Sequence, residues 1–224
     1  TLPPREVARV MNPVMTANLA SGAAVGNLGV LDLIGNTPMV DVSHLSPNPD
    51  VRIIAKLEMQ NPFGSVKDRI AKAMIEAAEK DGRLTPGQTI LEPSSGNTGI
   101  ALAAIARLKG YPIKILLPES VSIERRQMLE IMGAEVILTP GGEGSNGAVR
   151  RATDMAEAHP EWCMVYQYGN DANPRAHYES TGPEIWRDAP DITHFVAGLG
   201  TSGTLMGTGR FLKERNPDVQ IIAV

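Results

Sequence analysis

The chain has 224 residues, of which 42% are hydrophobic and 21% charged, and its formal net charge is −4. This composition is typical of a globular protein, and the slight acidity argues against nucleic acid as the main partner. The sequence contains no apolar run of the roughly 20 residues that cross a bilayer, so no membrane segment is expected. The single cysteine, Cys163, excludes an internal disulfide, and four histidines without ligand spacing give no reason to expect a metal.

From residue 28 onward, short apolar runs alternate with amphipathic stretches. Strands are predicted at 39–42, 52–57, 89–91, 113–117, 135–138, 164–166, 193–197 and 220–224. Helices are predicted at 66–81, 96–109, 122–132, 145–158, 178–187 and 204–215. The glycine-rich interval 141–147 is interpreted as a mobile connection. Strands alternating with helices of this length predict an α/β fold with mostly parallel sheets.

The two ends of the chain lie outside this alternation. Residues 1–27 are expected to be an N-terminal extension, either disordered or docked as an arm in a dimer, rather than a targeting peptide. The last predicted strand, 220–224, has the apolar character of a buried strand, and nothing follows to cover it. We therefore expect the chain to be part of a longer protein.

Lys67 is the first chemically informative residue. It lies in Asn61-Pro-Phe-Gly-Ser-Val-Lys-Asp-Arg69, in the first turn of a predicted helix, where the helix dipole disfavours a cation. A helix N-terminus and a desolvated pocket both favour the neutral amine that forms a Schiff base with an aldehyde. The alternative is an ordinary exposed lysine at a helix start. Asp68 and Arg69 are expected to pair elsewhere and fix the turn.

Two loops have the pattern of anion-binding sites, because each follows a strand and begins a helix. Ser94-Ser-Gly-Asn-Thr98 suits a carboxylate, although a simple helix cap is the alternative. Gly200-Thr-Ser-Gly-Thr204 suits a phosphate, although a tight turn or the dinucleotide fingerprint Gly198-Leu-Gly-Thr-Ser-Gly203 also fits. An amine, a carboxylate loop and a phosphate loop together predict pyridoxal phosphate chemistry on an amino acid.

In combination, these motifs resemble the fold-type II pyridoxal-phosphate enzymes of the cysteine synthase family, from Ile34 to the end of the chain. Tyr166-Gln-Tyr-Gly-Asn170 and Thr181-Gly-Pro-Glu-Ile-Trp186 are more similar to the cysteine synthase B branch than to cystathionine β-synthase. The resemblance implies two open parallel-sheet α/β domains, like those of the tryptophan synthase β subunit. The larger, truncated domain comprises 28–60 and 166–224 and binds the cofactor phosphate, and the smaller, mobile domain comprises 61–165.

The resemblance also implies the roles of individual residues. Lys67 is the catalytic residue and holds pyridoxal phosphate as a Schiff base, while Asn97 bonds the 3′-oxygen of the cofactor. The cofactor phosphate is bound by Gly200, Thr201, Ser202, Gly203 and Thr204. The substrate carboxylate is bound by Ser94, Ser95, Gly96, Thr98 and Gln167. The implied reaction forms L-cysteine by β-replacement from O-acetylserine or O-phosphoserine and sulfide or another sulfur donor, in a cytoplasmic homodimer.

The sequence departs from the family pattern in two ways. Ser94 stands where the family more often has threonine, so this loop is expected to be held slightly less firmly. The serine that pairs with the cofactor's pyridine nitrogen is expected beyond Val224. Cystathionine β-synthase or serine/threonine dehydratase activity would share Lys67 and both loops. Alternatives of a different class are a non-catalytic amino-acid- or peptide-binding paralogue and a nucleotide-binding oxidoreductase built on Gly198–Gly203.

Overall fold

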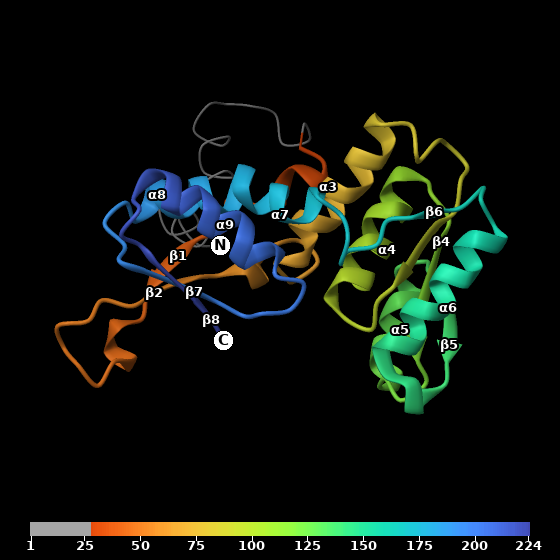
Figure 1. The fold of residues 1–224 in the computed structure, drawn as a ribbon, viewed down its shortest axis with the longest axis horizontal. Helices are drawn as coiled ribbons and strands as arrows, with labels where there is room; N and C mark the ends of the chain where they lie inside the picture. The colour runs from red at the N-terminus through yellow and green to blue at the C-terminus, as the bar shows by residue number, and fades with distance from the viewer. Residues whose placement is uncertain (1–27) are drawn as a thin grey trace, which may run out of the picture.

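The computed structural model describes residues 28–224, and residues 1–27, where the N-terminal extension is expected, lie outside the described part. Strands and helices alternate along most of the described chain, as the sequence predicts. Figure 1 shows helix α3 (Lys67–Lys80) between two groups of elements. It packs against α4 of one group and α7 of the other. Within residues 28–224, no helix is both long and apolar enough to cross a bilayer.

One group is built on a parallel sheet with the strand order β5-β4-β3-β6. Its strands are β3 (Ile90–Pro93), β4 (Ile113–Pro118), β5 (Glu135–Thr139) and β6 (Cys163–Met164). Its helices are α4 (Asn97–Lys109), α5 (Ile123–Ile131) and α6 (Gly144–Ala158). The helices follow their strands in the chain, as β-α-β crossovers require.

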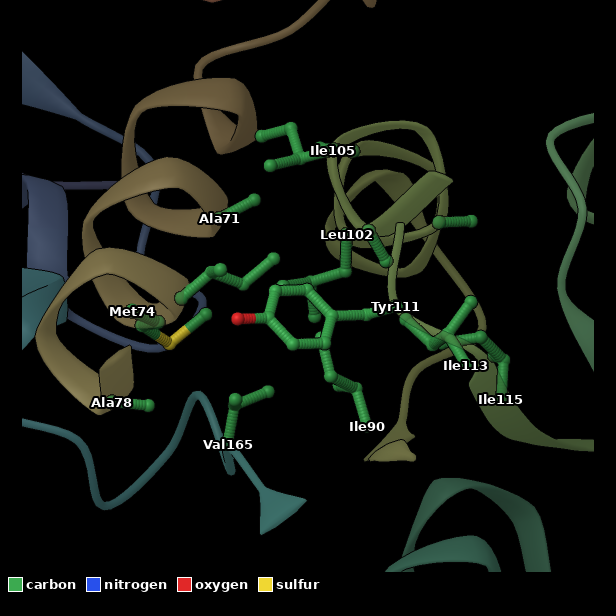
Figure 2. Packing of buried hydrophobic residues seen from close by; sticks show 14 of the residues in the cluster. Ala71, Met74, Ala78, Ile90, Leu102, Ile105, Tyr111, Ile113, Ile115 and Val165 are labelled. Carbon is green, nitrogen blue, oxygen red and sulfur yellow. The ribbon is translucent and has the colours of Figure 1, made fainter. Parts of the chain in front are cut away.

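Both faces of this sheet are covered, because successive strand residues point to opposite sides. Ile90 and Ile115 belong to the cluster that contains α3 and α4, whereas the adjacent Leu91 and Leu116 pack against α6. In Figure 2, Met74 of α3 lies in the same packed cluster as Leu102 and Ile105 of α4. The strands read as continuous apolar runs for this reason.

The other group contains two separate pairs of strands. The pair β1 (Met39–Asp41) and β2 (Ile54–Lys56) is antiparallel, whereas β7 (His194–Ala197) and β8 (Gln220–Ala223) are parallel. The helical elements are α7 (Ala172–Ala176), a π-helix (His177–Thr181), α8 (Gly182–Asp188) and α9 (Gly203–Arg215). Short 3₁₀ helices lie at Val30–Leu33, Ser43–Leu45, Glu58–Gln60 and Gly141–Glu143. Ile185, Phe211 and Leu212 join α8 and α9 in a separate core.

Two predictions about local structure are wrong. The interval 141–147 is not a mobile connection, because it forms a 3₁₀ helix and the first turn of α6. The Gly141 N–H donates to the Glu119 carboxylate at 3.1 Å, and Gly147 leaves space for the Glu143 side chain, so glycine here allows close packing. The strand predicted at 164–166 ends at Met164, because Tyr166 turns into positive φ (49°).

Candidate active site

A cavity of about 340 Å³ lies between the two groups of elements. Three of the predicted motifs contribute to it: Lys67, the whole of the loop 94–98, and Gly200 with Thr201. Gln167 also lines the cavity, as do the exposed Tyr168 and residues Ser145, Ala148 and Val149 of α6. Ser202, Gly203 and Thr204 follow directly in the chain but are not among the lining residues.

Lys67 is held in place by the turn that precedes α3. Its backbone N–H donates to Ser65 Oγ at 3.1 Å, and Asp68 accepts the Phe63 N–H at 2.6 Å, so the turn is fixed from both sides. Burial lowers the pKa of the Lys67 amine. Since the N-terminus of α3 also disfavours a positive charge, the amine is shifted toward its neutral, nucleophilic form.

A buried ionic cluster anchors the same turn, and no local pattern in the sequence indicates which residues pair in it. Arg69 donates to Glu58 from Nε at 2.8 Å and to Glu184 from both terminal nitrogens at 2.7 Å. Lys56 Nζ lies 2.7 Å from Glu184 Oε2. Burial alone would raise the pKa of Glu184, but its bonds and charge contacts, first with Arg69 and then with Lys56, lower it to about 2.

The loop 94–98 combines a helix cap with a face on the cavity. Ser94 Oγ accepts the Gly99 N–H at 3.0 Å, so it satisfies a first-turn donor of α4 from two residues before the N-cap residue, Gly96. Thr98 is buried and donates to Gln167 Oε1 at 2.7 Å, so this pair fixes the orientation of the amide. Asn97 is exposed at the first position of α4 and lines the cavity.

A buried carboxyl group, Glu92, lies directly before this loop. It accepts backbone N–H groups from Tyr166 at 2.7 Å and Gln167 at 3.1 Å, in place of the ladder bonds that a longer β6 would make. Burial raises the pKa of Glu92 to about 8, even though these two donors act in the opposite direction. Glu92 therefore connects the loop 94–98 to the segment that carries Gln167.

The loop 200–204 is supported from below by Asn173. Its Nδ2 donates to Thr201 Oγ1 at 2.9 Å and to the Gln167 carbonyl at 3.0 Å, so one side chain connects the loop 200–204 to the segment that carries Gln167. Gly203 is required here, because an added Cβ would lie 1.9 Å from Asn173 Oδ1. Ser202 takes positive φ (62°) at the start of α9, a conformation that directs backbone N–H groups outward.

These features fit an aldehyde cofactor that carries a phosphate. The half-buried amine of Lys67 is available for an imine, and α9 is a 13-residue helix whose N-terminus suits an anion. An added Cβ at Gly200 would meet nothing within 4 Å, so an oxygen can approach the backbone there. The cavity volume of about 340 Å³ lies in the range of small-ligand sites, which is roughly 300–1,000 Å³.

Such a fold and site define an α/β protein in which a lysine shares one cavity with two loops that each begin a helix. The sequence profile of the pyridoxal-phosphate dependent enzymes matches residues 30–224. The chain therefore belongs to this family, whose cofactor is pyridoxal phosphate, and the predicted fold class and resemblance are confirmed.

Relatives and solved structures narrow the likeness to the cysteine synthases. The chain is 47% identical to cysteine synthase 3 of Caenorhabditis elegans over 86% of its own length, and 45% identical to cysteine synthase of Staphylococcus aureus over 87%. It spans only 58% and 63% of these curated relatives. Among solved structures, O-ureido-L-serine synthase superposes with a TM-score of 0.85 at 40% identity, covering 89% of this chain and 63% of that one. A cysteine synthase of Entamoeba histolytica gives 0.83 at 38% identity, with coverages of 89% and 61%.

Proposed function

We propose that this cavity binds pyridoxal phosphate and an O-activated serine, and that the protein forms L-cysteine by β-replacement with sulfide or another sulfur donor. The observation that carries this function is the desolvated Lys67 amine in one cavity with two helix N-terminal loops. The similarity to two cysteine synthases supports the same reaction. O-acetylserine and O-phosphoserine both have the required leaving group.

The proposed roles of the residues come from the resemblance to cysteine synthases, and the cavity lining supports those of Lys67, Asn97, Gly200 and Thr201. Lys67 Nζ would hold the cofactor aldehyde, Asn97 its 3′-oxygen, and residues 200–204 its phosphate. Bound pyridoxal phosphate supplies an electron sink that makes the substrate Cα proton acidic and allows a group on Cβ to leave. Lys67 Nζ would accept that proton, and burial, which lowers the pKa of the amine, favours the neutral form that can act as a base.

The substrate carboxylate would be bound by the loop 94–98 together with Gln167. The Thr98 hydroxyl holds the Gln167 amide oxygen, so the amide is positioned before the substrate arrives. We further propose that residues 61–165 form a smaller domain that closes over the substrate and excludes water. A cytoplasmic homodimer completes the proposal and is supported by the resemblance to cysteine synthases.

The experiment that tests this function is borohydride reduction of the full-length protein with saturating pyridoxal phosphate, followed by peptide mapping. A pyridoxyl group is expected on the peptide that carries Lys67, and Lys67→Ala should abolish it. Lys72→Ala is the matched control, because Lys72 lies one turn further along α3 and donates to the Leu31 carbonyl at 3.1 Å. Absence of label on the unmodified protein would refute the proposed function.

Product analysis separates the reactions that share the same lysine. O-acetylserine or O-phosphoserine with sulfide should give cysteine. Serine with homocysteine tests for cystathionine formation, and serine or threonine alone tests for the oxo acid of a dehydratase. Cystathionine or an oxo acid as the main product would replace cysteine synthesis by one of these activities.

A further inference from the structure

Three side chains form a continuous hydrogen-bonded row behind the loop 200–204. His177 is the first residue of the π-helix and is fully buried. Its Nδ1 lies 2.9 Å from Thr181 Oγ1, and its Nε2 lies 3.1 Å from Thr204 Oγ1 at the start of α9. The row therefore ends on the last residue of the predicted phosphate loop.

The imidazole ring of His177 is neutral at physiological pH. Burial, followed by the positive charges of Arg69 and Lys67, lowers the pKa of His177 to about 3. A neutral imidazole has one N–H donor and one acceptor nitrogen. Only one of the two threonine hydroxyls can therefore accept a hydrogen bond from the ring.

Thr181 decides which nitrogen carries the proton. Its side chain is 2% exposed, and within residues 28–224 its hydroxyl has one hydrogen-bond partner, His177 Nδ1. If Nδ1 were protonated, the buried Thr181 hydroxyl proton would have no acceptor, which is costly. Nδ1 is therefore the acceptor and Nε2 carries the proton. Nε2–H donates to Thr204 Oγ1, so the hydroxyl proton of Thr204 is free to point away from the ring.

Close backbone packing keeps the ring at this distance. An added Cβ at Gly207 would lie 2.0 Å from the Pro174 carbonyl oxygen and 2.9 Å from His177 Cβ. Helix α9 therefore touches the segment that carries His177 one turn beyond Thr204. The π-helix, a geometry often found at functional sites, brings residues four apart into the His177–Thr181 contact.

We propose that Thr181 and His177 are positioning residues that set the Thr204 hydroxyl as a hydrogen-bond donor to the cofactor phosphate. A phosphate monoester is largely a dianion near neutral pH and mainly accepts hydrogen bonds. If the ring held the opposite tautomer, the Thr204 hydroxyl would donate its proton to His177 Nε2. Only oxygen lone pairs would then face the phosphate. The relay rests on the function proposed above, because it has a ligand only if pyridoxal phosphate binds in this cavity.

The test compares two ligands that differ only in the phosphate, using full-length protein from which the cofactor has been removed. Thr181→Val should weaken pyridoxal phosphate binding about tenfold and leave the affinity for pyridoxal unchanged. Thr181→Ser restores the hydroxyl and should restore the affinity. Thr153→Val is the matched control, because Thr153 lies exposed on α6 and bonds only the Val149 carbonyl within the described chain. An equal loss for both ligands would show a merely structural role and overturn the relay.

A double variant and a spectrum give two further readouts. Thr181→Val should add nothing to the loss caused by Thr204→Val, whereas additive losses would contradict the relay. Nitrogen NMR of ring-labelled histidine should show His177 protonated on Nε2 in the folded protein, and protonation on Nδ1 would overturn the assignment. The spectrum needs no bound cofactor. A failure of the relay is therefore distinguishable from a failure of the proposed function, which the borohydride experiment detects.

Discussion

The Arg69 guanidinium and the Glu184 carboxylate, 115 residues apart in the chain, form a bidentate ion pair with both N–O distances at 2.7 Å. Arg69 lies two positions after Lys67, so the pair fixes the first turn of α3 to α8. Planar arginine suits this geometry better than lysine does. The position of the Lys67 amine consequently depends on a contact far from it in sequence.

Arg69→Met should reduce the free energy of unfolding by about 3–5 kcal/mol, because it leaves buried carboxylates without their partner. Urea unfolding followed by circular dichroism measures the change. Arg210→Met provides the control, since the Arg210–Glu214 pair is exposed, and its unfolding midpoint should stay where it is. Equal effects of the two substitutions would contradict a structural role for the buried cluster.

Gly207→Ala should destabilise the protein by about 1–3 kcal/mol, because the new methyl group would lie 2.0 Å from the Pro174 carbonyl oxygen. Thermal unfolding is the measurement. Gly142→Ala is the matched control, since an added Cβ there meets nothing within 4 Å. If both variants had the same melting temperature as the unmodified protein, the close approach of α9 to α7 would be wrong.

Ser202→Gly should stabilise the fold by up to about 1 kcal/mol, because glycine relieves the positive φ of 62° but adds freedom to the unfolded chain. Ser202→Ala keeps the strain and loses the hydroxyl bond to the Thr201 carbonyl, which is 2.6 Å long. The order of melting temperatures should be glycine, serine, alanine. A glycine variant that melts below the unmodified protein would disprove the strain.

The stability of the protein should fall on acidification through His177. The folded-state pKa is about 3 against an ordinary value of 6.5, so between these values only the unfolded chain binds the proton. The free energy of unfolding therefore decreases as the pH drops from 6.5 to about 3. His177→Asn should make this decline shallower, and substitution of the exposed His44 should not. Unfolding titrations at several pH values decide between these outcomes.

The helices were the most predictable elements, because their ends carry local signals. The helix predicted at 96–109 is observed at Asn97–Lys109, and Gly110 ends it in the left-handed conformation (φ 80°). The three motifs were also predictable, since each combines a strand end, a glycine and a helix start. Their placement around one cavity could not be predicted in this way. The two loops follow strands of separate sheets, β3 and β7, and Lys67 comes after the antiparallel pair β1–β2.

Long-range contacts could not be predicted from the sequence. The Tyr166 backbone N–H donates to the Glu92 carboxylate, 74 residues away in the chain, and not to a neighbouring strand as the predicted strand would require. Asn173 meets Thr201 across 28 residues, and no local pattern marks that pair. The interval 141–147 shows the opposite error, since glycine content was interpreted as mobility although Gly147 leaves space for the Glu143 side chain in the first turn of α6.

Asn173 gives the site a thermodynamic property that neither loop has alone. Its amide nitrogen bonds the Gln167 carbonyl and the Thr201 hydroxyl at the same time. Ordering one of these partners lowers the entropy cost of ordering the other, and such linkage is reciprocal. Protein with bound pyridoxal phosphate should therefore bind the amino-acid substrate more tightly than protein without it. The bound amino acid should in turn slow the dissociation of the cofactor.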